Sequence, residues 1–162
     1  MNKCPYCDQP MALPYRGHND ILIVGEYPED RDIADGIPFR GQGGEVLQHE
    51  LARNGNNLWT NNLANFWLHR KNDREECKNH SITTLLREMS GRKVLLMGSE
   101  MSNYFMNRSV TELNGMEITS PMFPGSVQFV MISLSPRACL RAPSGEFRFA
   151  IKRFLDKAKE AK

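Results

Sequence analysis

Three short runs of consecutive apolar residues stand out from an otherwise mixed chain. They occupy residues 21–25 (ILIVG), 93–98 (KVLLMG) and 127–133 (VQFVMIS). Short, continuous apolar runs bounded by glycine or polar residues are typical of strands that are buried on both faces of a parallel sheet. Residues 58–64 (LWTNNLA) form a weaker, more polar candidate. The pattern therefore predicts a parallel sheet with four strands.

The segments between these runs carry apolar residues at helical spacing. Residues 44–54 end at an Asn-Gly pair, which is a helix stop signal, and residues 81–89 and 100–106 predict shorter helices. The tail over residues 146–162 places apolar residues on one face and Lys and Arg on the other. Strands that alternate with helices indicate βαβ units, helices on both faces of the sheet, and a ligand site at the carboxyl ends of the strands.

Length and composition restrict the kind of protein. A chain of 162 residues is about one domain long, and 40% hydrophobic residues with 25% charged residues are typical of a globular protein. We therefore expect one domain over 1–162 with an N-terminal arm over 1–20. The net charge of +2 means that a polyanion has to be held by a local patch. No signal peptide or membrane span is recognisable, so we expect a cytoplasmic protein without a membrane partner.

The loop after the first apolar run carries the densest chemistry of the chain. Residues 25–44 (GEYPEDRDIADGIPFRGQGG) combine acidic residues, an aromatic pair and several glycines. A connection of this length is uncommon unless it serves a site. Glycine lets a backbone approach a ligand closely, and the amides from Gly41 onward are expected to meet a phosphate at the start of the following helix.

Two parts of this loop resemble a known motif. Residues 25–28 (GEYP) and 36–44 (GIPFRGQGG) give G-E-x-P, seven residues, then G-x-P-F-x-G-x-x-G, which resembles the first motif of the family 4 uracil-DNA glycosylases. The similarity continues through residues 46–51, 60–63 and 93–98. The resemblance implies a three-layer α/β/α sandwich with a short four-stranded parallel sheet. It also implies a monomeric enzyme that flips uracil or a modified pyrimidine out of single- or double-stranded DNA and hydrolyses its N-glycosidic bond.

The resemblance assigns roles around a base pocket. Phe39 is the aromatic platform that stacks on the base. Asn62 reads the pyrimidine edge, with Asn61 as the close alternative, because a carboxamide complements the O4 and N3–H of uracil. Asp32 falls where the family has a loop glutamate and is expected to steer water or stabilise the cationic sugar, with Asp30 and Asp35 as substitutes.

Other positions depart from the family. The second motif, His-Pro-Ser, reads Ser-Pro-Arg here, so Ser135 replaces a histidine and is a weaker donor that cannot become cationic. Tyr27 and Glu29 stand where the family usually has a small residue and a glycine. Tyr27 is expected to border the base and to restrict its C5 side or change which base fits. Glu26 is also expected at the base site, although its first role is to accept backbone amides and fix the loop. The DNA contacts implied after the last strand are phosphate contacts and an apolar wedge from Arg137, Leu140 and Arg141.

Cysteines indicate a metal site. Cys4 and Cys7 form a Cys-x-x-Cys pair and Cys77 matches a further ligand of the family's four-iron cluster, but one cysteine ligand is missing. His69, or alternatively His80, can complete a site with three cysteines and one histidine, which suits zinc or a modified 4Fe-4S cluster. Cys139 lies too far from this motif and is expected to be a plain small residue.

Loss of the motif histidine leaves other functions open. A catalytically weak or inactive DNA-binding module that recognises a modified or flipped base would keep the fold without the reaction. A metal-stabilised protein that binds a partner and has a vacant pocket is a third interpretation, for which the near-neutral charge gives mild support.

Overall fold

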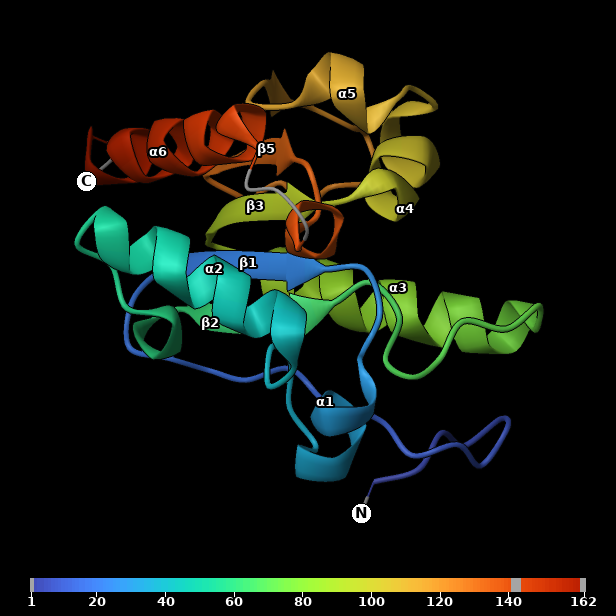
Figure 1. The fold of residues 1–162 in the computed structure, drawn as a ribbon. Helices are drawn as coiled ribbons and strands as arrows, with labels where there is room; N and C mark the ends of the chain where they lie inside the picture. Colours follow the sequence, from blue (N-terminus) through green and yellow to red (C-terminus); the bar gives the residue numbers. More distant parts are fainter. Residues whose placement is uncertain (1, 141–143, 161–162) are drawn as a thin grey trace.

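The computed structural model describes residues 2–140 and 144–160, and a five-stranded sheet with the strand order β2-β1-β3-β5-β4 lies at its centre (Figure 1). The four parallel strands are β1 (Ile21–Gly25), β2 (Asn62–Asn65), β3 (Lys93–Met97) and β5 (Phe129–Ser133). β4 (Glu117–Ile118) pairs antiparallel with β5 at one edge. The predicted α/β fold with a parallel sheet is confirmed. The predicted strand count is one too low, because a two-residue edge strand leaves no periodic pattern.

The weak strand candidate at 58–64 is shorter and lies later in the chain than predicted. Its first part is a 3₁₀ turn, η1 (Leu58–Thr60), because the Asn57 side chain accepts a hydrogen bond from the backbone of Trp59 at 2.9 Å. Side-chain caps of this kind compete with strand formation. The strand therefore begins at Asn62 and ends at Asn65.

Helices flank the sheet, with bounds that differ from the predicted ones. They are α1 (Asp30–Asp35), α2 (Gln42–Arg53), α3 (Glu75–Met89), α4 (Ser99–Met101), α5 (Val110–Leu113) and α6 (Gly145–Glu160). The predicted helix at 100–106 is α4 followed by a π-helical turn, η2 (Ser102–Met106), and α1 lies within the loop that was expected to be irregular. A short 3₁₀ turn, η3 (Pro136–Cys139), follows β5. No helix in the described part of the chain has the length and apolar character to cross a membrane.

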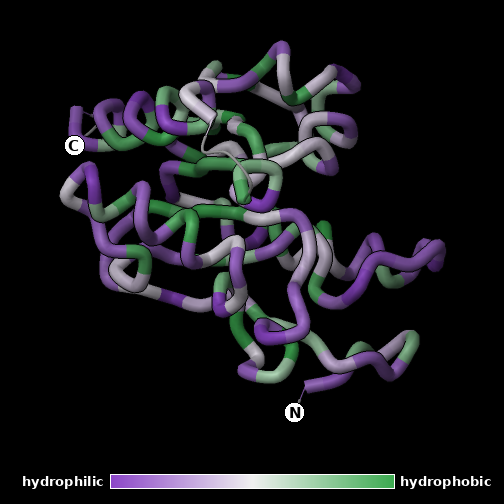
Figure 2. Tube along the Cα trace, viewed as in Figure 1, coloured by the Kyte–Doolittle hydropathy of each residue, from purple (hydrophilic) through white to green (hydrophobic). Residues whose placement is uncertain are grey.

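Alternate residues of each strand face two separate cores. Ile23 and Leu95 pack beneath α2 and α6, whereas Leu22 and Val94 pack beneath α3 and the segment from α4 to α5 (Figure 1). Figure 2 shows the apolar residues gathered in the central strands and the polar ones on the outer turns of the helices. The sheet is thus covered on both faces, as the continuous apolar runs predicted.

The N-terminal arm runs along the outer edge of β2. Tyr15 and Leu63 exchange two backbone hydrogen bonds of 2.8 Å, and the amide of Ala12 donates to the carbonyl of Leu68 at 2.8 Å. An exposed edge strand would otherwise present unpaired amides and carbonyls. The arm therefore covers this edge and brings its first residues to the start of α3.

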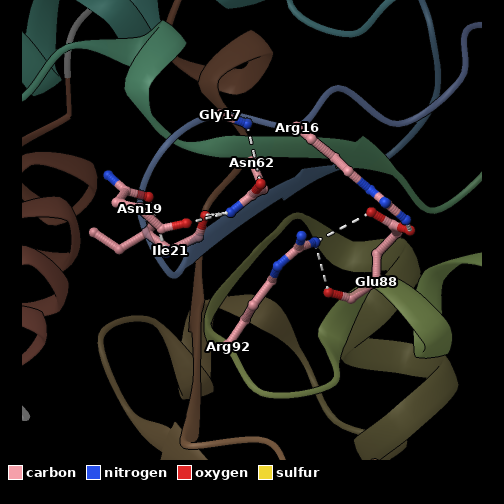
Figure 3. Close-up of polar contacts among 7 residues, drawn as sticks. All are labelled: Arg16, Gly17, Asn19, Ile21, Asn62, Glu88 and Arg92. Carbon is pink, nitrogen blue, oxygen red and sulfur yellow. Dashed lines mark hydrogen bonds and ion pairs between the residues drawn. The ribbon is translucent and has the colours of Figure 1, made fainter.

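A buried carboxylate joins the arm to the amino-terminal edge of the sheet. Glu88, near the end of α3, accepts from Arg16 at 3.2 Å and from Arg92 at 3.1 Å (Figure 3). Its side chain is 7% exposed. Burial raises the pKa of Glu88, but the hydrogen bonds from both arginines outweigh burial and hold the pKa below its ordinary value.

At the opposite edge, α2 lies directly against the loop that carries Phe39. A Cβ atom placed on Gly44 would lie 2.0 Å from the Phe39 carbonyl oxygen. The backbone of Phe39 has a φ of 61°, a left-handed conformation that is costly for a bulky residue. The close approach of α2 therefore helps to keep Phe39 in this conformation.

We expect Glu88→Gln to lower the free energy of unfolding by about 1–2 kcal/mol at pH 7, since hydrogen bonds to a charged partner are lost. A carboxyl with a depressed pKa stabilises the fold above its unfolded pKa of about 4.3 and loses this effect as the pH falls through the folded pKa. The difference between the proteins should therefore shrink below about pH 4. Urea unfolding between pH 3 and 7 measures this difference.

The matched control is Glu112→Gln, which removes an exposed ion pair with Arg108 of 3.2 Å. Its cost should stay below about 0.5 kcal/mol at every pH. Equal effects of the two substitutions would contradict the role given to Glu88.

We expect Gly44→Ala to destabilise the protein by about 1–3 kcal/mol, because a new methyl group would overlap the backbone at Phe39 and this outweighs the better helix propensity of alanine. Thermal unfolding measures the change as a shift of several degrees. Gly125→Ala is the control, because a Cβ there meets nothing within 4 Å. Similar melting temperatures for both variants would argue against a tight contact between α2 and the loop.

Candidate functional site

The carboxyl-terminal ends of β1, β2 and β5 surround a small pocket. Gly25 ends β1, Asn65 ends β2, and Ser135 follows β5. The side chains that complete the wall come from the loop after β1 and from η3, and they include Glu26, Tyr27, Glu29, Asp32, Phe39 and Arg137. The free space is about 30 Å³, enough for only a few water molecules.

Phe39 forms one wall of the pocket. Phe39 is 8% exposed, and its ring lies against Gly25, where a Cβ atom would come within 3.1 Å of the ring. The absence of a side chain at Gly25 thus allows the ring to reach the strand end. Left-handed backbone at a bulky residue is a form of strain that concentrates at functional sites. The structure therefore places an aromatic face at the edge where ligands bind in parallel α/β folds.

Asn65 lines this pocket and carries an unpaired donor. The residue is 4% exposed, and its Nδ2 is the one buried side-chain nitrogen or oxygen without a hydrogen-bond partner in the described ranges 2–140 and 144–160. A buried donor without a partner costs about 1–3 kcal/mol. Such a group in a pocket wall can accept a partner from a bound ligand, water or ion.

The structure corrects the prediction for Asn62. Asn62 begins β2 and lies at the opposite, amino-terminal edge of the sheet, where its Oδ1 accepts from the Gly17 amide at 3.0 Å (Figure 3). Its Nδ2 donates to the carbonyls of Asn19 and Ile21, each at 2.9 Å. The side chain is thus fully engaged one strand length away from the pocket. The alternative, Asn61, is likewise bonded to Asn19 and Asn56.

Asp32 holds the two sides of the pocket loop together. It is 3% exposed, and its carboxylate accepts from the amides of Glu29 at 2.9 Å, Arg40 at 2.7 Å and Gly41 at 3.0 Å. Burial raises the pKa of Asp32, and the three amides offset part of the rise. The carboxylate predicted to act in catalysis therefore lies in the pocket wall and also fixes the backbone on either side of Phe39.

The start of α2 is occupied by the chain's own carboxylates. Glu29 Oε2 accepts from the Gly43 amide at 2.9 Å, and the Gly41 amide donates to Asp32. The expectation that the Gly41 amide meets a DNA phosphate is therefore wrong for this conformation. Helix N-termini favour anions, and here Glu29 satisfies that preference from within the chain.

Glu26 links the pocket floor to the next loop. Its Oε2 accepts from the Glu100 amide at 2.9 Å and from the Ser99 hydroxyl at 3.3 Å. Gly98, at a φ of 120°, lies so close that a Cβ there would be 2.3 Å from the Glu26 carboxyl carbon. Although Glu26 lines the pocket, its carboxylate holds the start of α4.

A wider hollow of about 640 Å³ adjoins the pocket and shares Tyr27, Glu29 and Arg137 with it. Four basic and two acidic residues line this hollow, namely Arg31, Arg70, Lys71 and Arg137 with Glu29 and Asp30, so its charge is net positive. Arg70 pairs with Asp30, and Lys71 pairs with Glu100 at 2.9 Å. A narrow pocket beside a positively charged hollow suits a ligand that inserts one group into the pocket and carries anionic groups that remain in the hollow. No pattern in the sequence predicted that Arg70 and Lys71 would line a site.

The segment after β5 takes a defined turn. Ser135 caps η3 by accepting from the Arg137 amide at 3.2 Å, and a Cβ placed on Gly43 would lie 3.1 Å from the Arg137 side chain.

Tyr27 borders both the pocket and the hollow, and burial together with nearby carboxylates raises its pKa. Leu140 is 40% exposed and lines a separate hollow with Val46. Arg141 lies outside the described residues.

The predicted metal ligands come together. The donor atoms of Cys4, Cys7, His69 and Cys77 all lie within 4.8 Å of one another. Three of these side chains are at most 2% exposed. His80, the alternative ligand, stacks edge-on against Tyr6 at 5.9 Å between ring centres and is outside the cluster. Thiols and imidazole in such a group form a donor set that fits a metal.

The electrostatics of the cluster favour a thiolate. Burial raises the pKa of Cys4, but the backbone amides of Tyr6 and Cys7 and the side chain of His69 more than compensate and lower the pKa to about 7. Burial and the two neighbouring thiols raise the pKa of Cys77 to about 11. Deprotonation is therefore favourable for Cys4, whereas for Cys77 it is unfavourable unless a cation binds beside the sulfur.

Comparison with known protein families gives a match over most of the chain. The model of the uracil DNA glycosylase superfamily matches residues 15–159, which include the pocket loop, Asn65 and the segment after β5. The cysteine pair of the arm precedes the matched segment. No curated protein matches the chain. Since the match covers most of the 162 residues, the chain belongs to the uracil DNA glycosylase superfamily.

Proposed function

We propose that this protein is a DNA glycosylase that hydrolyses the N-glycosidic bond of uracil or a modified pyrimidine after the base has flipped into the pocket. The observation that carries the proposal is the buried, unpaired Nδ2 of Asn65, a residue that lines the same small pocket as Phe39. A flipped base needs an aromatic face to stack on and polar groups for its edge. Membership of the superfamily supports the same class of reaction.

The carboxamide of Asn65 suits a pyrimidine with a 4-oxo group. Its Nδ2 would donate to O4 while its Oδ1 accepts from N3–H, whereas cytosine offers the reverse pattern at these positions. A hydrogen bond to O4 also strengthens as negative charge develops on the departing base. Asn65 would therefore select the base and stabilise its departure.

Two carboxylates can support the developing sugar cation. Asp32 is the candidate for electrostatic stabilisation or for steering water, and its three backbone hydrogen bonds keep the carboxylate in place. Glu29 borders both the pocket and the basic hollow. The free space of about 30 Å³ is too small for a base, so we infer that Glu29 and Arg137 move when the nucleotide enters.

DNA would lie over the basic hollow. Arg70, Lys71 and Arg137 supply positive charge next to the pocket and are suited to contact phosphates on either side of the flipped nucleotide. Leu140 is exposed and remains the candidate for an apolar wedge. We propose that one chain, folded as a single domain with its N-terminal arm, acts as a monomer on DNA.

A base-recognising binder is the second candidate. The observation that favours it is Ser135, which lines the pocket where a cationic donor would assist the leaving base. Mass spectrometry of free bases distinguishes the two functions. Release from oligonucleotides that contain uracil, 5-hydroxymethyluracil, thymine or cytosine, single and double stranded, identifies an enzyme and its substrate. Binding without release identifies a binder.

We expect Asn65→Leu to reduce base release at least about 100-fold, because the donor to the departing base is lost. The same substitution should raise the free energy of unfolding by about 1 kcal/mol, since it removes a buried donor that has no partner in the free protein. Single-turnover base release and urea unfolding measure the two effects.

Asn62→Leu is the matched control. It breaks three hydrogen bonds at the other edge of the sheet and should lower stability by about 2 kcal/mol or more, while base release per folded protein stays unchanged. Full activity of Asn65→Leu, or loss of activity in folded Asn62→Leu, would contradict the assignment of the base-reading residue.

We expect Ser135→His to raise base release by about 10- to 100-fold below pH 6.5, where the new imidazole is cationic, with a smaller gain above pH 7. Rates measured from pH 5.5 to 8 give this profile. Ser126→His is the control. Ser126 is exposed and hydrogen-bonds to Ser90 near the amino-terminal ends of the strands, so this substitution should leave the rate unchanged. A rate that is equal or lower at all pH values would show that position 135 does not face the leaving base.

A further inference from the structure

The spacing of the metal-ligand cluster matches a single ion. In a tetrahedral zinc site with Zn–S bonds of about 2.3 Å and Zn–N bonds of about 2.0 Å, two sulfurs lie about 3.8 Å apart and a sulfur and a nitrogen about 3.5 Å apart. Cys4 Sγ and Cys77 Sγ are separated by 3.8 Å, and Cys7 Sγ and His69 Nε2 by 3.5 Å. Both distances are those of neighbouring ligands on one tetrahedral ion.

A four-iron cluster does not fit this spacing. In such a cluster each ligand binds a different iron, so the four ligand atoms surround a cube of iron and sulfide and lie farther apart than the ligands of one ion. Here all four donor atoms lie within 4.8 Å of one another. The set is also three cysteines and a histidine, which is an ordinary combination for structural zinc and an uncommon one for iron-sulfur clusters.

Neighbouring groups orient the ligands for this role. His69 Nδ1 lies 2.7 Å from the Arg70 carbonyl oxygen, to which it can donate, and this leaves Nε2 as the free lone pair toward the sulfurs. Asn72 Nδ2 donates to Cys77 Sγ at 3.6 Å. Hydrogen bonds of this kind fix the tautomer of a metal-binding histidine and the position of a thiolate.

We infer that Cys4, Cys7, His69 and Cys77 bind one structural zinc ion in place of a four-iron cluster. The ion joins the N-terminal arm to the start of α3 and to the segment after β2. Because His69 is followed directly by Arg70 and Lys71, the ion also fixes the backbone that presents two basic side chains to the hollow beside the pocket. This inference rests on the proposed metal site and does not depend on the proposed glycosylase reaction.

The test is the metal and sulfide content of the full chain, purified without oxygen from cells supplied with both iron and zinc. Elemental analysis should find one zinc per chain, no acid-labile sulfide, and no visible absorption from iron and sulfide. Four irons with four sulfides, or a folded protein without stoichiometric metal, would overturn the inference. Base release measured on the same sample shows separately whether the proposed reaction holds.

Two variants identify the ligands. His69→Ala should weaken zinc binding at least about tenfold in a competition with a chelator, whereas His80→Ala, altered on the same side of the molecule, should bind zinc as the native chain does. If His69→Ala does not fold, His69→Cys keeps four ligands and should still bind one zinc. Replacement of zinc by cobalt(II) should give the absorption of a tetrahedral site with three sulfurs. An octahedral cobalt spectrum, or zinc loss in His80→Ala, would overturn the assignment.

DNA affinity tests separately whether the ion fixes the backbone beside the basic hollow. Removal of the ion should weaken the binding of a single-stranded oligonucleotide severalfold at low salt and lower its salt dependence, because Arg70 and Lys71 lose their fixed backbone. Unchanged DNA affinity in the metal-free, folded protein would limit the ion to holding the arm and overturn this part of the inference.

Discussion

The arrangement of the pocket depends on one buried carboxylate that collects three backbone amides. Asp32 bonds to amides on both sides of the loop and so fixes a backbone that contains a left-handed phenylalanine. The first turn of helix α2 lies against the backbone of Phe39 in the same loop, and Gly44 permits that contact. Without these constraints Phe39 would relax to an ordinary backbone conformation, because left-handed geometry is costly for a bulky side chain.

The remaining parts of the site are attached to this loop from different regions of the chain. Glu26 connects the end of β1 to the start of α4, and the arm pairs with β2 and then reaches the cysteine and histidine cluster. The pocket is therefore surrounded by segments that are distant in sequence but joined by short polar contacts. Stability in this region comes from hydrogen bonds to backbone groups as much as from the two apolar cores.

Much of the fold could be predicted because buried parallel strands leave continuous apolar runs. Position within a strand was harder to predict: η1 takes the first residues of the expected second strand, so the asparagine at its carboxyl end is Asn65, whereas Asn62 lies at its start. The predicted metal ligands lie together as expected, since their residue types are rare and their chemistry is specific; they are Cys4, Cys7, His69 and Cys77. Glu29 gave no comparable signal, because charged residues in loops are common and their partners are set by tertiary contacts.

The carboxylates at the start of α2 separate the lining of the base pocket from the attraction of anions, two functions that a helix end can combine. Since Glu29 and Asp32 neutralise the positive end of this helix, the wall beside Phe39 does not attract anions, and free phosphate or nucleotides gain little by entering. Attraction to a polyanion then comes from the arginines and lysine around the outer hollow. Salt would consequently change how strongly the protein holds a strand, while the choice among uncharged bases inside would stay nearly the same at every ionic strength.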